Sequence, residues 1–337
     1  MDRPYVKYAK EPRDVTNSSP AFPLRIMQWN ILAQSLATNE SFPYVPEQAV
    51  SAAPLRLALI VEQIRTYTPD VVCLEEVDRC GAIGVDQIAS QLCEPDVRTG
   101  FCLTLGASGF RGDEAKGTGI GVCVFVNPAR VRIVANRVMK FGDVGDPQLV
   151  LLCLAETVSS QQSRRFGLAA THLKAKVEFA AVRQRQMQML LAALNSGSMI
   201  PQGCALVVAG DFNAEPSETA VEMALGSEGR LLSLYGEILG DINLWTTWKI
   251  RDKELRRCID YIFYRDGDTD QASAKNSKSG NNGNGPESSM ADCDCCRSIA
   301  PVGCFAQPSD EQIPATRLPS VSFPSDHLNL IADICLY

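Results

Sequence analysis

The sequence predicts an α/β fold in which two mixed β-sheets pack face to face and helices cover their outer faces. Short apolar runs, typical of buried strands, alternate with segments whose apolar residues recur at helical spacing. Some neighbouring strands are joined by short connections and others by helices, whereas a purely parallel doubly wound sheet would alternate more regularly. Hydrophobic residues make up 45% of the 337 residues, which is enough for a sizeable core.

The first half of the chain begins with a strand over residues 24–30, LRIMQWN. Residues 50–67 carry apolar side chains at helical spacing, and the pair Pro69-Asp70 ends this helix. The apolar run VVCLEEVD at 71–78 follows as a strand. GIGVCVFV at 119–126 comes after a Gly-rich turn and is expected to be a buried strand, and 131–138 continues the pattern.

In the second half, the runs at 148–157 and 165–173 indicate consecutive strands with a short connection. Residues 177–194 show helical spacing of apolar side chains. CALVVAGDFN at 204–213 is expected to be a strand that runs into a loop. The last two strands are expected at residues 258–265 and 327–336.

Two segments fall outside this pattern. Residues 1–22 mix both charge signs and lack an apolar signal core, which predicts a disordered leader. Residues 266–303 are rich in Gly, Asn and Ser, which is typical of a disordered insertion. Its CDCC stretch at 293–296 matches no common zinc spacing. A single catalytic domain is therefore expected over 23–337, and no apolar run is long enough for a membrane span.

The overall charge indicates the class of substrate, and the cysteines indicate the cellular compartment. A net charge of −7 favours a small or locally held anionic substrate over a long nucleic acid, which usually needs a basic face. The thirteen cysteines are odd in number and scattered through apolar runs, which indicates a reducing compartment without a disulfide framework. A cytoplasmic location is therefore expected.

The polar residues gather where the expected strands begin or end. Ligand sites of α/β sheets form at strand ends, where loops converge. Each residue alone also has an ordinary structural explanation as a turn, a cap or a hydrogen-bonded core group. Both histidines of the chain share this placement, however, which packing alone does not explain. The residues concerned are Asn30, Glu75, Glu76, His172, Asp211, Asn213, Asp260, Asp326 and His327.

These residue types suit metal-assisted hydrolysis at phosphorus. Mg²⁺ prefers oxygen ligands, usually one or two carboxylates together with water and substrate phosphate. Glu76 and Asn30 are the expected metal-binding residues. The signatures of a P-loop, an HExxH zinc site and a GxSxG nucleophile are all absent from the sequence.

The remaining polar residues have roles in the same reaction. The adjacent Asp326 and His327 suggest a pair in which the carboxylate orients the imidazole for proton transfer near neutral pH. Asp211 is expected to activate or orient the attacking water. Asn213 and His172 are expected to donate hydrogen bonds to the phosphoryl oxygens.

Six segments carry a family resemblance. In chain order these are QWNILA, LEEVD, THLKAK, GDFNAEP, IDYIFY and PSDHLNL. Together they resemble the endonuclease/exonuclease/phosphatase superfamily over residues 24–337, apart from the expected insertion. TTWKIR at 246–251 and RLPS before PSDH narrow the resemblance to one group in the deadenylase-like branch.

The resemblance implies a four-layer αββα sandwich and Mg²⁺-dependent hydrolysis, with Mn²⁺ as a substitute. It makes Glu76 the principal metal ligand, with Asn30 nearby, and His327 the general base oriented by Asp326. Asp260 supports the metal site or the reacting group, and His172 contacts the scissile phosphate, while Asp211 and Asn213 position the nucleophile and the phosphate.

The implied substrate is NADP⁺ or NADPH, which would lose its 2′-phosphate to give NAD⁺ or NADH. The alternative is a 3′-exoribonuclease that shortens poly(A), and a non-catalytic scaffold in mRNA regulation is a lesser one. The resemblance allows a mitochondrial pool, and no obligate protein partner is evident. The expected substrate-binding residues are Lys174, Lys176, Lys249, Arg251 and Trp248.

Two positions depart from the family pattern. Glu75 stands where the superfamily usually has glutamine, which adds a charge beside the metal ligand Glu76. Lys176 stands where the group usually has arginine, so bidentate phosphate binding is lost at this position.

Overall fold

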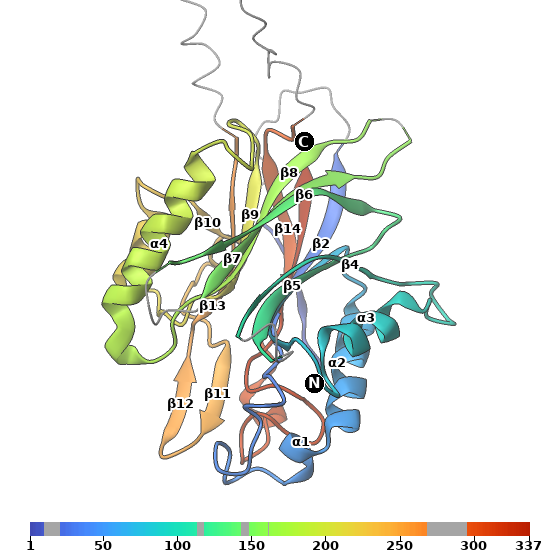
Figure 1. Ribbon diagram of the computed structural model, residues 1–337, viewed down its shortest axis with the longest axis vertical. Helices are drawn as coiled ribbons and strands as arrows, with labels where there is room; N and C mark the ends of the chain where they lie inside the picture. Colours follow the sequence, from blue (N-terminus) through green and yellow to red (C-terminus); the bar gives the residue numbers. More distant parts are fainter. Residues whose placement is uncertain (10–20, 113–117, 143–147, 161, 268–294) are drawn as a thin grey trace, which may run out of the picture.

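The computed structural model describes residues 1–9, 21–112, 118–142, 148–160, 162–267 and 295–337. Two mixed β-sheets pack face to face, and helices cover the outer face of each (Figure 1). The predicted α/β fold with a four-layer αββα arrangement is confirmed. No helix among the described residues combines the length and the apolar character needed to cross a membrane.

The first sheet has seven strands and carries two helices, α2 (Ala53–Tyr67) and α3 (Val85–Cys93), on its outer face. The short helix α1 (Gln48–Ser51) precedes α2. From edge to edge, the strands are β1 (Tyr5–Lys7), β14 (Ile299–Phe305), β15 (Leu330–Leu336), β2 (Phe22–Asn30), β3 (Val71–Asp78), β5 (Ile120–Val126) and β4 (Thr104–Arg111).

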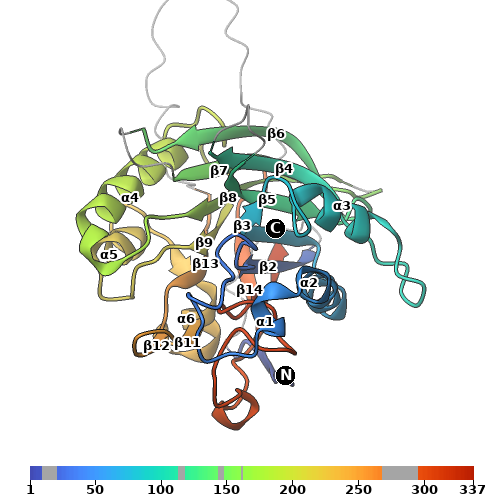
Figure 2. The same ribbon diagram turned by 60° about the horizontal axis from the view of Figure 1, so that its bottom comes forward.

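The second sheet has six strands, and α4 (Ala180–Asn195) and α5 (Thr219–Leu225) lie outside it (Figure 2). In order, its strands are β10 (Leu232–Ser233), β13 (Asp260–Arg265), β9 (Leu206–Asp211), β8 (Arg165–His172), β7 (Leu149–Thr157) and β6 (Val131–Lys140). The remaining elements of the described residues are α6 (Leu234–Leu239), a hairpin of β11 (Thr247–Ile250) and β12 (Glu254–Arg257), and 3₁₀ turns at Val177–Phe179 and Asp310–Gln312.

Side chains along each central strand point alternately to the two faces of its sheet, and this separates the buried side chains into layers. Side chains such as Ile26 of β2 and Val207 of β9 point between the sheets and form the middle core. Their neighbours Met27 and Val208 point outward, where they meet the helices. Three buried clusters of the described residues result from this alternation, one between the sheets and one beneath each pair of helices, and a smaller fourth cluster surrounds Phe42.

Strand direction brings the predicted polar positions to one end of the sandwich. β2 and β3 are parallel, as are β8 and β9, so the carboxyl ends of each pair lie side by side. β15 runs antiparallel to β2, and β13 runs antiparallel to β9, so both begin at this same end. This end also carries the β11–β12 hairpin, at the bottom of Figure 1.

Most predicted strands are present, but two predictions of disorder are wrong in part. β1 lies within the expected leader and pairs with β14. Residues 299–303 of the expected insertion belong to β14, which pairs with β15. Residues 10–20 and 268–294 of the two segments lie outside the described residues. Residues 5–7 and 299–303 are ordered because both short strands pair with strands from distant parts of the chain, which supply their backbone hydrogen bonds.

The N-terminal segment is attached through a buried arginine. Arg3 is 6% exposed and donates hydrogen bonds to the carbonyl oxygens of Phe305 and Ala306, both at 2.8 Å. A third bond of 2.7 Å reaches the carbonyl of Asn329, two residues after His327. The start of the described chain thus contacts the loop that carries a predicted site residue.

Candidate active site

Asn30 and Glu76 form the part of the site that the first sheet supplies. β3 has an irregularity between Glu75 and Val77, and Glu76 adopts a left-handed backbone with φ of 56°. Such a bulge re-aims a side chain that would otherwise follow the strand alternation. Nδ2 of Asn30 donates to Oε1 of Glu76 at 3.1 Å and to Oδ2 of Asp211 at 3.0 Å. One amide therefore bridges carboxylates from both sheets.

Asp211 and His172 come from the adjacent strands β9 and β8, where they are paired in register. Gly210 permits this close approach, because a Cβ there would lie 2.0 Å from the carbonyl oxygen of Thr171. Nε2 of His172 lies 3.6 Å from Oδ2 of Asp211. Burial, followed by the charge of Asp260, raises the pKa of Asp211 although both histidines oppose this. A bound cation would relieve the repulsion between these carboxylates.

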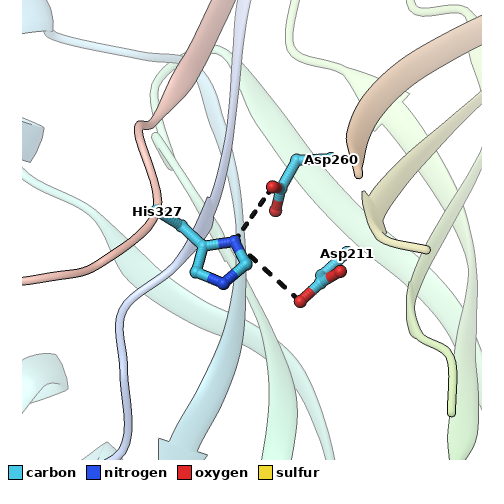
Figure 3. Close-up of side chains that lie close together, drawn as sticks. All are labelled: Asp211, Asp260 and His327. Atoms are coloured by element: carbon cyan, nitrogen blue, oxygen red, sulfur yellow. Dashed lines mark hydrogen bonds and ion pairs between the residues drawn. The ribbon is translucent and has the colours of Figure 1, made fainter. Parts of the chain in front are cut away.

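His327 is hydrogen-bonded to Asp260, as Figure 3 shows. Its Nδ1 lies 2.9 Å from Oδ2 of Asp260 and 4.0 Å from Oδ2 of Asp211. Oδ2 of Asp260 also accepts from the hydroxyl of Thr246 at 2.6 Å, and its Oδ1 accepts from Nε2 of Gln28 at 3.1 Å. Burial opposes protonation of His327, but the carboxylates of Asp260 and Asp326 outweigh it and raise the imidazole pKa to about 9.

The expected pairing of Asp326 with His327 is wrong in this structure. Oδ2 of Asp326 lies 3.9 Å from Nε2 of His327, too far for a hydrogen bond. The carboxylate instead contacts Nζ of Lys249 at 2.5 Å, and Nη2 of Arg251 lies 4.0 Å away. Burial raises the pKa of Asp326, but Lys249 outweighs it and holds that pKa below its usual range. Asp326 therefore contacts the cation of β11, Lys249, and lies near Arg251, which directly follows this strand.

Asn213 occupies a turn after Asp211. Its backbone φ is 51°, and its N–H donates to Oδ1 of Asp211 at 2.8 Å. Its side-chain Nδ2 donates to the carbonyl oxygen of Leu173 at 3.1 Å. Asn213 thus links the loops after β9 and β8, beside the position predicted for the substrate phosphate.

A buried arginine that the sequence analysis missed holds two of the loops that carry predicted site residues. Arg56 of α2 has an exposed fraction of 0%. Its guanidinium donates to the carbonyl oxygens of Ile31 at 3.0 Å, Leu32 at 2.5 Å and Pro324 at 3.0 Å. It therefore joins the loop after Asn30 to the segment before Asp326. The available signal was a charged residue within the apolar stretch APLRLALI.

Lys174 and Lys176 lie on the loop after His172, which a second buried arginine holds. Arg183 of α4 donates to the carbonyl oxygens of Lys174 at 2.8 Å and Lys176 at 2.6 Å. It also forms an ion pair with Glu218 at 2.6 Å. Lys176 is exposed with a φ of 75°, and Lys174 is partly buried. Both lysines therefore lie on a loop whose backbone is fixed directly after His172.

Trp248 is not placed for stacking on a substrate. Its side chain is 5% exposed, and the guanidinium carbons of Arg256 and Arg317 lie 4.2 Å and 4.3 Å from its ring centroid. Its Nε1 donates to Glu254 at 2.7 Å. These contacts make Trp248 a packing residue of the hairpin, and they correct its expected role in substrate binding.

A small pocket lies beside His172 at the same end of the sandwich. Arg111, Gly121 and Gln148 line it together with His172. Arg111 ends β4, and Gln148 immediately precedes β7, so the pocket lies where the two sheets meet. The sequence analysis did not select either residue, because it predicted no strand at 104–111 and assigned Gln148 only to the start of the strand at 148–157.

The buried acidic groups could hold a metal ion. Ligand atoms of Asp211, Asp260 and His327 all lie within 4.8 Å of one another. Through Asn30, the carboxylate of Glu76 is joined to that of Asp211. Carboxylate and amide oxygens are the donors that a hard cation such as Mg²⁺ prefers, so the residues present fit this ion.

Comparisons with known proteins agree with this geometry. A model described as the Endonuclease/Exonuclease/phosphatase family matches residues 27–327. Nocturnin of Xenopus laevis is 31% identical over 95% of this chain and 74% of its own length. Nocturnin of Homo sapiens is 31% identical over 92% of this chain and 65% of its own length. The chain thus spans about two thirds of the human relative.

Two solved structures share the fold. The human Nocturnin catalytic domain with bound sulfate matches with a TM-score of 0.63 and 23% identity, covering 99% of this chain and 97% of that one. ANGEL2, described as a 2′,3′-cyclic phosphatase in complex with adenosine-2′,3′-vanadate, matches with a TM-score of 0.70 and 17% identity, covering 100% and 99%. The motifs TTWKIR and RLPS point within the superfamily to nocturnin, and the relatives confirm this resemblance.

Proposed function

Because the chain belongs to the endonuclease/exonuclease/phosphatase family, whose model covers residues 27–327, we propose that it is a Mg²⁺-dependent phosphohydrolase. Its proposed reaction removes the 2′-phosphate of NADP⁺ and NADPH to give NAD⁺ and NADH. The observation that carries the proposal is the buried Asp260–His327 pair, which lies beside Asp211 and the Asn30–Glu76 contact.

The proton-transfer step belongs to His327. Its Nδ1 is hydrogen-bonded to Asp260, which leaves Nε2 to accept a proton from the attacking water. Asp211 lies 4.0 Å from the imidazole and would orient that water. His172, 3.6 Å from Asp211, would donate a hydrogen bond to a phosphoryl oxygen.

The metal would be held by Glu76 and Asn30, with Asp211 adjacent. When bound, Mg²⁺ would neutralise charge that develops on the phosphoryl oxygens. A cation at this position also opposes the field of the carboxylates that raise the pKa of His327 to about 9. Cation binding would therefore favour the neutral imidazole, which is the form that acts as a base.

Three observations support a dinucleotide substrate. Lys249 and Arg251 lie at Asp326, and Lys174 and Lys176 follow His172, so positive groups flank the site for the other phosphates. The related ANGEL2 structure holds an adenosine-2′,3′-vanadate. The 2′-phosphate of NADP is likewise carried on an adenosine ribose. The net charge of −7 also favours a compact anion over a long RNA.

The test is a parallel assay of the purified protein with Mg²⁺ against NADPH and an oligo(A) RNA. Release of inorganic phosphate from NADPH with intact RNA is the expected result. Shortening of the RNA without turnover of NADPH would replace the proposal by a 3′-exoribonuclease. Glu76→Ala is expected to abolish hydrolysis of either substrate, and an active Glu76→Ala variant would contradict the proposed metal site.

A further inference from the structure

Glu75 is a fully buried carboxylate that the reaction outlined above does not use. It lies on β3 and faces the space between the sheets, with an exposed fraction of 0%. Gln28, on the neighbouring strand β2, is equally buried. Its Nε2 donates to Oε2 of Glu75 at 2.7 Å and to Oδ1 of Asp260 at 3.1 Å. Glu75 is thus connected to Asp260 through a single amide.

This connection determines which way the amide of Gln28 faces. A glutamine side chain has an amino end with two N–H donors and a carbonyl end that only accepts. The carboxylate of Glu75 attracts the amino end, and Asp260 takes the second donor. The reversed amide would place its carbonyl oxygen against both carboxylates. Glu75 therefore selects the orientation in which Gln28 can hold Asp260.

The same contacts extend to the imidazole. Gln28 holds Oδ1 of Asp260, while Thr246 and His327 bind Oδ2. With both oxygens engaged, the carboxylate has little freedom to rotate. The plane of Asp260 in turn orients the ring of His327 by the hydrogen bond to Nδ1.

Burial of Glu75 and Gln28 in this arrangement destabilises the folded protein. Oε1 of Glu75 and Oε1 of Gln28 are buried and have no hydrogen-bond partner among the described residues. Unpaired buried polar atoms destabilise a protein, and an apolar side chain of similar size would avoid the cost. Because Glu75 destabilises the fold and is joined to Asp260 through the amide of Gln28, we infer that its role is not packing.

We propose that Glu75 is a positioning residue, which fixes the amide of Gln28 and so holds Asp260 and the imidazole of His327 in place. This role rests on the proposed function, because it matters for turnover only if His327 accepts the proton. The geometric part, the orientation of the imidazole, is independent of any substrate.

The kinetic test compares substitutions that remove or keep the acceptor at position 75. Glu75→Leu should lower kcat by about tenfold, the size of effect expected for an outer partner and less than the loss of a general base itself, and leave KM within about twofold. Glu75→Gln keeps an acceptor and should retain kcat within about threefold. Thermal unfolding distinguishes positioning from packing, since Glu75→Leu is expected to have an unchanged or higher Tm. A wild-type kcat in Glu75→Leu would overturn the proposal.

Two further variants control for damage to the fold. Gln28→Leu breaks the same connection and should reproduce the kcat loss, and the double variant should be no slower than either single variant. Cys73→Ala changes a buried residue two positions before Glu75 on the same face of β3. It should leave kcat unchanged. If Glu75→Leu fails to fold, Gln28→Leu decides the outcome: wild-type activity there contradicts the connection.

Nitrogen NMR of the imidazoles tests positioning without activity. The chain has only two histidines, so His172→Gln assigns both ring signals. In metal-free wild-type protein, His327 should show a protected Nδ1–H signal. This signal should be lost or broadened in Glu75→Leu and in Gln28→Leu. The control Cys73→Ala should keep it. If the wild type hydrolyses neither substrate, the proposed function fails. An unchanged His327 signal in Glu75→Leu would refute the positioning role itself.

Discussion

The His327 ring shows that neighbours in sequence need not be partners in space. Asp326 precedes it directly, yet Nδ1 of His327 bonds to Asp260, 67 residues earlier in the chain. Lys249 attracts the Asp326 carboxylate instead, at 2.5 Å. The motif PSDH identifies the histidine correctly as part of the polar cluster, but its carboxylate partner depends on strand pairing that no local pattern contains.

Substitution of the two aspartates should separate their roles. Asp260→Asn keeps the shape but weakens the orientation of His327, so kcat should fall by about 10²–10⁴-fold. Asp326→Asn loosens Lys249 and should act mainly on KM. Steady-state kinetics with NADPH checks both. A larger kcat loss in Asp326→Asn than in Asp260→Asn would restore the pairing that the sequence suggested.

The imidazole pKa makes a second prediction for a single residue. The folded pKa of about 9 lies above the ordinary value of 6.5, so protonated His327 stabilises the metal-free protein. This stabilisation is complete below pH 6.5 and disappears as pH rises through about 9. At 1.36 kcal/mol per unit it amounts to about 3 kcal/mol. Urea unfolding in the presence of a chelator measures the free energy of unfolding of wild type and of His327→Gln. The difference between the two should shrink as the pH rises from 6.5 to about 9. A difference that stays constant with pH would contradict the prediction.

At the scale of elements, two helices contact the loops of the site through buried arginines. Arg56 of α2 and Arg183 of α4 each donate to carbonyl oxygens of loops that carry site residues. These carbonyls follow or precede strands and therefore lack partners in a sheet. Each arginine thus replaces the hydrogen bonds that regular structure would otherwise supply.

Loss of the Arg56 guanidinium should damage the fold and the site together. Arg56→Leu leaves buried carbonyls unpaired and should reduce the free energy of unfolding by about 3–5 kcal/mol. Arg65→Leu, on the same helix but with exposed hydrogen bonds, is the control and should cost less than about 1 kcal/mol. Denaturant unfolding measures both. Similar losses in the two variants would argue against a special role for Arg56.

The elements that the sequence predicted are those with a strong local pattern. β3 is predicted at 71–78 and observed as Val71–Asp78, because four consecutive apolar residues begin it and a Pro-Asp turn precedes it. β4, Thr104–Arg111, contains two glycines and few buried side chains, so its pattern is weak. β1 and β14 are short and pair with each other far apart in sequence, and only tertiary contacts make them strands.

At the scale of the whole molecule, the site joins the two sheets at one end of the sandwich. Asn30 and Glu76 come from the first sheet, and His172, Asp211 and Asp260 from the second. Strand ends could be identified from the sequence, and so could most members of this cluster. The supporting residues Arg56, Thr246 and Gln28 could not, because hydrophobic periodicity does not reveal buried polar contacts.

A cation at this junction should stabilise the entire sandwich, because it would bind oxygens from both sheets in the folded state alone. At a Mg²⁺ concentration of 100 times Kd the gain is about 2.7 kcal/mol, which should raise Tm by several degrees. Chelation should reverse the rise. Glu76→Gln should abolish the response, whereas Asp333→Asn, whose carboxylate pairs with Arg25 at 2.7 Å, should retain it. A response in Glu76→Gln equal to that of wild type would place the stabilising cation elsewhere.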